Sequence, residues 1–296
     1  MVVESNKFQK SGKNFTFSLQ NTDSLRFPVL ISVPHAGREY PPEISENLRV
    51  PASYLLKLED RYSDLLANSA TAAGFPVIMA RKSRAWIDIN RDRNELDPDM
   101  ITGMDQSCLP QMSRKVRGGL GIIPRRLNGI GNLWREKWQY THIMSRIAED
   151  HEPYHTCVDD ILSAMRSRFG GAILLDLHSM PPLLDTQQEP VNFVIGDRFG
   201  QSSDSLFAEL VAARLRSSGL SGQTNHPYPG GYVLDRHGQP EHHIHALQIE
   251  IDRSLYLDKS LREPTKAVES ISKMISDVAL RLSNHLNDRG SMEAAE

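Results

Sequence analysis

Two histidines in the sequence stand directly after apolar runs of the kind that form buried strands. His35 follows PVLISVP and His178 follows AILLDL, while Glu250 lies within a third run, ALQIEI. Functional side chains in α/β proteins gather where strands end, and imidazole and carboxylate groups are common ligands of zinc. A lone histidine is more often a structural residue held by hydrogen bonds, so this pattern leaves both a zinc site and a structural role open.

The acidic ligand that such a zinc site needs has three candidates in the segment KLEDRYSDLL. These are Glu59, Asp60 and Asp64, and the last two would share one face of a helix. A solvated acidic helix face would have the same composition. The spacing therefore leaves the third ligand undecided.

Four side chains with N–H donors surround a short alternating run in SRAWIDINRDRNE. Arg84, Asn90, Arg91 and Arg93 flank a predicted strand at residues 85–89. Arginine presents a planar fork that matches a carboxylate, so an Asn-Arg pair at a strand end can hold the carboxylate of a substrate. The same residues could instead form a surface ion-pair network with the acidic side chains nearby, which are Asp88, Asp92, Glu95 and Asp97.

Other segments offer further candidates for ligand binding. Gly230 and Gly231 precede His237 in YPGGYVLDRHG, a loop in which the backbone could approach a substrate closely or simply turn. The basic segment 114–126 could bind an anion or form a solvated loop. Three more histidines precede the third apolar run, as possible ligands or as a polar lead-in to the strand: His242, His243 and His245.

The motif HEPYH at residues 151–155 matches the H-E-x-x-H pattern of zinc peptidases. That pattern needs both histidines on one continuous helical face, whereas Pro153 removes a backbone N–H and clashes with the preceding turn. We therefore predict that Pro153 opens a helix that runs to Phe169, and that the motif is not a zinc site. The sequence contains no G-x-S-x-G, P-loop or G-x-G-x-x-G pattern, which disfavours a serine hydrolase and a nucleotide-binding protein.

Strands and helices alternate along the chain. The apolar runs predict strands at residues 28–34, 75–80, 85–89, 172–177, 192–197 and 246–251, and helical spacing predicts helices at 55–74, 204–219 and 264–286. Because several runs are apolar on both faces, we expect an α/β fold, a three-layer sandwich with a central mixed, largely parallel sheet. We expect a single domain over residues 1–296, with mobile ends at 1–14 and 287–296.

The composition argues against several functional classes. The chain has 296 residues and a net charge of −3, and no apolar run reaches the ~18 residues that a bilayer-spanning helix needs. This charge gives no general attraction to nucleic acid or to anionic membranes, so we expect a small-molecule partner. The first residues lack the features of a signal peptide, and Cys108 and Cys157 provide no disulfide framework. We expect a soluble, cytoplasmic protein, whose oligomeric state the sequence does not predict.

Five segments, in order along the chain, resemble the N-formylglutamate amidohydrolase family: SVPHAGREYPPE, SRAWIDINRDRNE, LLDLHSMPP, GGYVLDRHGQP and HALQIEI. The resemblance implies a bound Zn²⁺ and a fold similar to that of zinc carboxypeptidases and the aspartoacylase group. It also implies that metal-activated water cleaves N-formyl-L-glutamate to formate and glutamate. Position by position, it places metal ligands at His35, Asp60 and His178, and it matches Glu250 to the carboxylate that handles the proton.

The same resemblance assigns roles around the substrate. Asn90 and Arg91 match the pair that grips the substrate's carboxylate, with Arg84 nearby. Independently of the resemblance, we expect the metal and Arg84 to stabilise the oxyanion. A second carboxylate would need another cation, for which the candidates are Arg93, Arg198 and the segment 114–126. Two other functions stay open, namely a related zinc deacylase that acts on another N-acyl amino acid and a non-catalytic small-anion-binding protein on the same scaffold.

Overall fold

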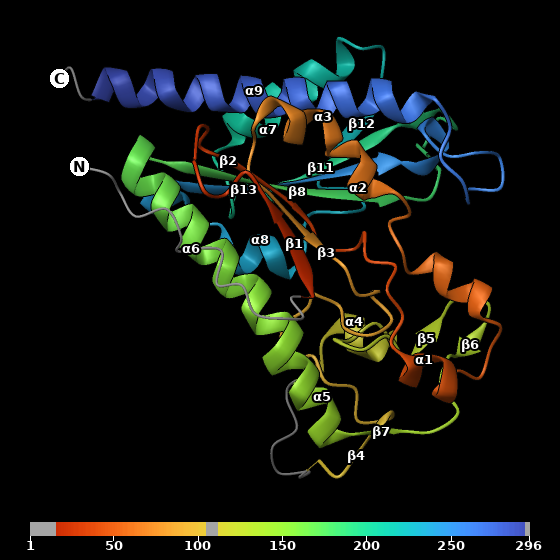
Figure 1. Cartoon of the computed structure of the whole chain (residues 1–296). Helices are drawn as coiled ribbons and strands as arrows, with labels where there is room; N and C mark the ends of the chain where they lie inside the picture. The colour runs from red at the N-terminus through yellow and green to blue at the C-terminus, as the bar shows by residue number, and fades with distance from the viewer. Residues whose placement is uncertain (1–15, 105–111, 294–296) are drawn as a thin grey trace.

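A central sheet of seven strands organises the protein, as Figure 1 shows for this computed structural model, which describes residues 16–104 and 112–293. The strand order is β1-β3-β2-β8-β13-β11-β12. The strands are β1 Phe17–Gln20, β2 Val29–Val33, β3 Val77–Ala80, β8 Ala172–Met180, β11 Phe193–Gly196, β12 Gly222–Thr224 and β13 Ile244–Asp252. β1 is antiparallel to β3 and β11 is antiparallel to β13, whereas the other neighbours are parallel. The predicted α/β fold with a mixed, largely parallel sheet is confirmed.

Five of the six predicted strands correspond to β2, β3, β8, β11 and β13. The sixth prediction, at residues 85–89, is wrong. Ile87 and Ile89 are buried, as the alternation predicts, but the Asp88 N–H donates to the carbonyl of Ile122 in a loop (2.7 Å). The segment is therefore a turn whose alternate residues enter the core without joining a sheet.

The two faces of the sheet differ in chemistry along its central strands. Alternate residues of β8 over 173–177 pack in one apolar core, whereas Asp176 and His178 point to the opposite face. Parallel pairing with β13 places Gln248 beside Asp176 and Glu250 beside His178. Four polar side chains thus share one face of the two longest strands.

Helices cover both faces of the sheet and complete the three predicted layers (Figure 1). On one face, α9 packs against α2, α3, α7 and the central strands, and on the other face α6 and α8 pack against β8. The bounds are α2 Ser63–Leu66, α3 Asn68–Ala73, α6 Glu152–Phe169, α7 Ser205–Arg216, α8 Tyr232–His237 and α9 Ala267–Glu293. The polar face of β8 and β13 therefore lies on the side of α6 and α8.

The predicted helices differ in how well they match the structure. The helix at 204–219 is confirmed as α7, and the helix at 264–286 is α9, which continues to Glu293. The predicted helix at 55–74 is instead broken into the 3-10 helix η1 Ala52–Lys57, α2 and α3, because Tyr62 adopts a left-handed conformation with a φ of 56°. The predicted mobile end at 1–14, and residues 294–296 of the other end, lie outside the described residues.

The helix around HEPYH begins earlier than the sequence predicts. α5 Tyr140–Arg146 leads into the π-helix η3 Ile147–His151 and directly into α6. The wide π turn lies just before Pro153. The helix therefore continues although this proline has no backbone N–H to donate. The predicted end is confirmed, since α6 stops at Phe169 and Gly170 follows with a φ of 81°.

Short elements form a group beside the sheet, below it in Figure 1. They are α1 Pro42–Asn47, α4 Arg114–Arg117, β4 Ile101–Thr102, β5 Arg126–Leu127, β6 Gly131–Asn132 and β7 Trp138–Gln139. The remaining short elements are β9 Leu183–Leu184, β10 Pro190–Val191, η4 Pro240–His242 and η5 Arg253–Leu255.

Within residues 16–104 and 112–293, none of the helices combines the length and the hydropathy that crossing a bilayer requires.

Candidate metal and substrate site

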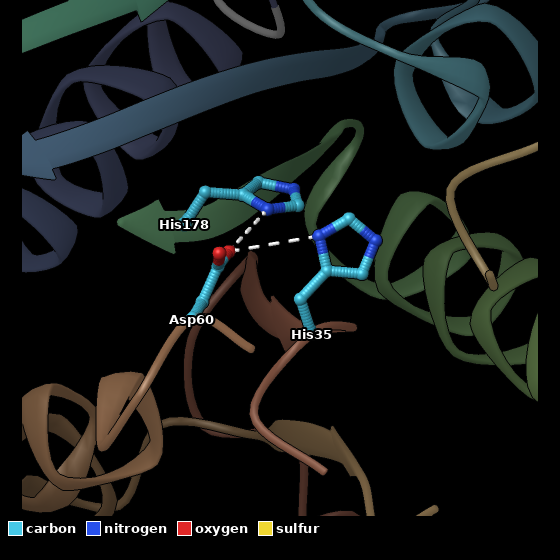
Figure 2. A group of neighbouring side chains, drawn as sticks. All are labelled: His35, Asp60 and His178. Carbon is cyan, nitrogen blue, oxygen red and sulfur yellow. Dashed lines mark hydrogen bonds and ion pairs between the residues drawn. The ribbon is translucent and has the colours of Figure 1, made fainter. Parts of the chain in front are cut away.

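Three side chains from distant parts of the chain converge on the polar face of the sheet, as Figure 2 shows. His35 follows β2, Asp60 precedes α2, and His178 lies in β8. The Asp60 Oδ2 atom is 2.9 Å from His178 Nδ1 and 3.6 Å from His35 Nδ1. One donor atom from each residue lies within 4.8 Å of the other two, and all three residues are buried. The structure thus brings together the three residues predicted as metal ligands, in a group that could hold a metal ion.

Asp60 faces the histidines, and its two acidic neighbours do not. Glu59 pairs with Arg61 (2.8 Å), and Asp64 pairs with Arg38 (2.7 Å). The idea that Asp60 and Asp64 share one helical face is wrong, because Asp60 lies in the chain before α2 begins. The fold therefore selects among candidates that the spacing left undecided.

Two further carboxylates orient the imidazole rings. His35 Nε2 donates to Asp88 Oδ1 (2.7 Å), and His178 Nε2 donates to Asp176 Oδ2 (2.8 Å). As a result, both rings direct Nδ1 toward Asp60. A histidine that binds a metal through one nitrogen commonly donates its other N–H to a carboxylate, which fixes the tautomer and makes the ligand more basic. The pairs His35–Asp88 and His178–Asp176 both have this arrangement.

The buried carboxylates give the site a negative field. Burial alone would lower the pKa of His178, but the charge of Asp176 and the hydrogen bonds to Asp176 and Asp60 raise it well above its ordinary value. Carboxylates that stabilise a proton on an imidazole would also stabilise a metal cation between the same groups. The donor set and its charge therefore fit a metal ion.

Arg253 is a contact of the site that the sequence does not single out. It begins η5 and donates from Nη2 to Asp60 Oδ1 (2.9 Å) and to the carbonyl of Ser179 (3.0 Å). Burial alone would raise the pKa of Asp60, but its interactions with His178 and His35 hold the pKa well below its usual range. Asp60 is thus an ionised carboxylate with one oxygen held by Arg253 and the other directed at the histidines.

Glu250 lies next to His178 because the two residues are paired across β13 and β8. Gln248 Nε2 donates to Glu250 Oε1 (3.1 Å), which fixes the direction of the carboxylate. Burial, opposed by the positive charge of His178, raises the pKa of Glu250 to about 7. A carboxylate that titrates near neutral pH can accept a proton and return it within one reaction cycle.

A cavity of about 340 Å³ opens onto the three-donor cluster and Glu250. Among the described residues, five cationic side chains line it: Lys57, Arg84, Arg91, Lys115 and Arg253. Of the basic segment 114–126, only Lys115 and Leu120 are among the lining residues. A small cavity with a basic wall suits an anionic small molecule.

Asp88 links the metal-ligand candidates to this basic wall. Its Oδ2 accepts from Arg84 Nε (2.7 Å), while its Oδ1 accepts from His35 and from the Asn90 N–H (2.9 Å). Burial raises the pKa of Asp88, but Arg84, Arg91 and His35 together bring it well below its ordinary value. Asp88 is fully buried, so this segment is not the solvated ion-pair network that the sequence also allowed.

Gly230 and Gly231, the predicted substrate-binding glycines, lie in the cavity wall. A Cβ atom at Gly231 would lie 2.2 Å from Asn90 Oδ1, so only glycine permits this close approach. Gly230 has a φ of 115°, which also favours glycine. The Asn90 Oδ1 atom accepts from the Val233 N–H (2.9 Å), so that α8 is attached to Asn90.

Two arginines proposed as substrate ligands lie outside the cavity wall. Arg93 forms an exposed ion pair with Glu152, and Arg198 pairs with Asp235 (2.6 Å). His237, also proposed as a substrate ligand, is buried in α8 and is not among the lining residues. These three assignments are corrected, because each side chain has partners of its own away from the donor cluster.

The histidines that precede β13 also lie apart from the site. His242 and His243 are exposed, and His245 lies at the opposite end of β13 from Glu250. Phe207 packs against the His245 ring at a centroid distance of 4.6 Å. Their interpretation as a polar lead-in to the strand fits these positions.

A parallel-rich sheet that carries two histidines, an aspartate and a near-neutral glutamate beside a basic cavity has the features of metal-dependent hydrolases. The sequence model of the N-formylglutamate amidohydrolase family matches residues 27–257, and the chain belongs to this family. It is 30% identical to N-formylglutamate deformylase of Pseudomonas aeruginosa, over 82% of this chain and 90% of the relative. The enzyme of the same name from Pseudomonas putida is 29% identical over the same shares.

Solved structures agree with this family membership. The crystal structure of N-formylglutamate amidohydrolase from Ralstonia eutropha is similar to the chain, with a TM-score of 0.84 and 27% identity. That similarity covers 92% of this chain and 99% of the other. A gene product of Agrobacterium tumefaciens, 18% identical with a TM-score of 0.62, shares the fold.

Proposed function

We propose that this protein hydrolyses the formyl amide bond of N-formyl-L-glutamate and releases formate and L-glutamate. Membership of the family and the names of the two Pseudomonas relatives support the proposal. The observation that carries it is the position of Glu250 beside the three-donor cluster in a basic cavity. Metal ligands, a proton acceptor and anion-binding groups lie together there.

The metal that we assign to the cluster is Zn²⁺, with His35, Asp60 and His178 as its protein ligands. Three nitrogen or oxygen ligands are usual at catalytic zinc sites, which keep a further position for water or substrate. Bound zinc supplies a Lewis acid that lowers the pKa of water and polarises an amide carbonyl. Asp88 and Asp176 support this assignment, since they hold both imidazoles with Nδ1 toward Asp60.

Glu250 is the group that moves the proton. Its carboxylate accepts a proton from the attacking water while the water oxygen forms a bond to the formyl carbon. The C–N bond then breaks, and Glu250 returns the proton to the departing amine nitrogen. Because burial raises its pKa to about 7, Glu250 serves as base in the first step and as acid in the second.

Two groups of side chains orient the substrate around this reaction. Arg84, held by Asp88, is assigned to the negative charge that develops on the formyl oxygen, a contribution of roughly 3 kcal/mol. Asn90 and Arg91 are assigned to the α-carboxylate. With that end held, the amide faces the donor cluster and the reacting atoms stay in place.

The side-chain carboxylate of glutamate needs a further cation. Lys57 and Lys115 are in the cavity wall and are exposed to solvent, so they can approach an entering anion. Arg93 and Arg198 are engaged in ion pairs elsewhere. We therefore assign the second carboxylate to the two lysines.

The direct test is release of formate from N-formyl-L-glutamate by the purified, zinc-loaded protein. N-acetyl-L-glutamate and N-formyl derivatives of uncharged amino acids serve as comparison substrates. Formate released chiefly from N-formyl-L-glutamate supports the proposal. Turnover of a different N-acyl amino acid without formate release would instead assign the protein to a related deacylase.

The rate is expected to fall in acid, because Glu250 must be ionised to accept a proton. With the pKa raised to about 7, the carboxylate is present above that pH and is lost as the pH falls through it. A cation bound beside the carboxylate would favour its charged form, so we expect the pKa in the zinc-loaded protein to lie between this value and the ordinary 4.5. We therefore expect kcat/KM to fall about tenfold per pH unit below an apparent pKa between these limits. A profile without this acid limb, over a range in which circular dichroism shows a folded protein, would contradict the role of Glu250.

Arg253→Lys is expected to weaken zinc binding about tenfold, because a lysine cannot hold both Asp60 and Ser179 as the guanidinium does. The substitution keeps the positive charge, so repulsion between this side chain and the metal is unchanged and the loss reports orientation alone. Competition with a chelator of known affinity measures the effect. Arg81→Lys, in an exposed pair with Glu39, is the matched control and should bind zinc as the wild type does. Equal affinity in both variants would exclude the orienting role of Arg253.

A further inference from the structure

Three histidines that this mechanism does not use lie behind the turn that carries Asn90. His151 and His155 belong to the HEPYH helix, and His237 ends α8. All three are buried, and the ring of His155 lies 4.4 Å from that of His151 and 5.1 Å from that of His237 between centroids. Each imidazole has two polar nitrogens, and among the described residues all six nitrogens have a hydrogen-bond partner except His151 Nδ1.

His151 and His155 bind the backbone on both sides of Asn90. His155 Nε2 donates to the carbonyl of Ile89 (2.9 Å), and His151 Nε2 donates to the carbonyl of Arg91 (2.8 Å). From the other direction, the Val233 N–H of α8 donates to Asn90 Oδ1 (2.9 Å). The turn at 89–91 is therefore held by α8 and by the helix that contains both histidines.

Hydrogen bonding sets the protonation of the pair formed by His155 and His237. His155 Nδ1 is 2.9 Å from His237 Nε2, and His237 Nδ1 is 2.6 Å from Asp159 Oδ1. The Ile89 carbonyl at one end and the Asp159 carboxylate at the other can only accept, so both outer nitrogens carry hydrogens, and the central contact needs a third. Three hydrogens on two rings make one ring an imidazolium. Burial lowers the pKa of His155 well below its ordinary value, so His155 is the neutral ring, with its hydrogen on the Nε2 atom that donates to Ile89.

We propose that His151 and His155 are positioning residues for substrate binding, which hold the turn at 89–91 so that Asn90 and Arg91 meet the substrate's carboxylate. The identity of that carboxylate rests on the proposed function. His237 keeps His155 in the tautomer that donates to Ile89. In this proposal the two histidines of the HEPYH motif do not contact the substrate. They act through their hydrogen bonds to the backbone of the turn at 89–91.

The kinetic test compares His151→Leu, which removes the donor, with His151→Gln, whose amide N–H can replace it. His151→Leu is expected to raise KM for N-formyl-L-glutamate about tenfold with kcat within about threefold of wild type and zinc content unchanged. His151→Gln is expected to restore KM to within about threefold. If the two variants have the same KM, or if the leucine variant loses zinc or kcat instead, His151 only fills space and the proposal is overturned.

Two measurements without substrate keep this test separate from the proposed function. Amide hydrogen exchange of peptides covering residues 88–93 should speed up about tenfold in His151→Leu and remain slow in His151→Gln. Imidazole ¹⁵N spectra of the wild type should show Nε2–H tautomers for His151 and His155. An Nδ1–H tautomer of His155, or equal exchange in both variants, overturns the positioning role even if formate is released. If the wild type releases no formate but the exchange difference and the tautomers are as expected, the proposed substrate is wrong and the positioning of the turn by the histidines stands.

Discussion

Glu250→Gln is expected to lower kcat for N-formyl-L-glutamate by roughly 10²- to 10⁴-fold, which is the usual contribution of a positioned general base. The glutamine side chain has a similar volume, and its carbonyl can still accept from Gln248 Nε2. It cannot accept a proton from water. Steady-state kinetics with detection of formate measures the loss, and KM is expected to stay within about threefold because the carboxylate-binding side chains are unchanged.

The matched control for this substitution is Glu269→Gln, which makes the same chemical change at an exposed position of α9. It should have wild-type kinetics, and both variants should contain as much zinc as the wild type. A Glu250→Gln enzyme with kcat within about tenfold of wild type would remove Glu250 from the mechanism.

Much of the site could be predicted because its residues carry local signals. His35, His178 and Glu250 stand in or after apolar runs, and the strand period alone places His178 and Asp176 on the same face of β8. Asp176 is an example of such a local signal, since an acidic residue within a buried strand needs a polar partner on its own face. Two residues further along that strand, His178 is this partner.

Contacts between distant segments carried no such signal. The choice of Asp60 over Glu59 depends on where the chain turns between η1 and α2, and the contact of Arg253 with Asp60 joins residues 193 positions apart. Asp88 illustrates the same limit, because its sequence neighbourhood is rich in charged residues and equally typical of a surface. Only the fold shows that its carboxylate is buried against His35.

Backbone details explain the two clearest errors in secondary structure. Residues 85–89 alternate as a strand does, but alternation reports only which side chains are buried, and a turn can bury the same ones. At HEPYH, the expected effect of Pro153 assumes regular α-helical hydrogen bonding. The π turn over 147–151 changes that bonding, so the helix continues and His151 and His155 share one face.

His178→Ala is expected to abolish both metal binding and turnover. Zinc sites with four ligands bind with about 10–16 kcal/mol, or roughly 3 kcal/mol for each ligand, so loss of one imidazole should weaken affinity about 100- to 1000-fold. The loss also leaves Asp60 and Asp176 buried without their shared partner, which adds a cost in stability. Elemental analysis after dialysis should find less than a tenth of the wild-type zinc, and formate release should fall below detection.

His242→Ala is the control, because it removes an exposed imidazole from η4 and should leave zinc and activity unchanged. Circular dichroism establishes whether the His178 variant is folded when its metal content is measured. If a folded His178→Ala protein keeps a full equivalent of zinc, the metal is bound elsewhere and the cluster of His35, Asp60 and His178 is not its site. Glu250 would then have no Lewis acid beside it. The cavity could still bind an anion through its cationic side chains, but it would lack the metal that the proposed hydrolysis needs.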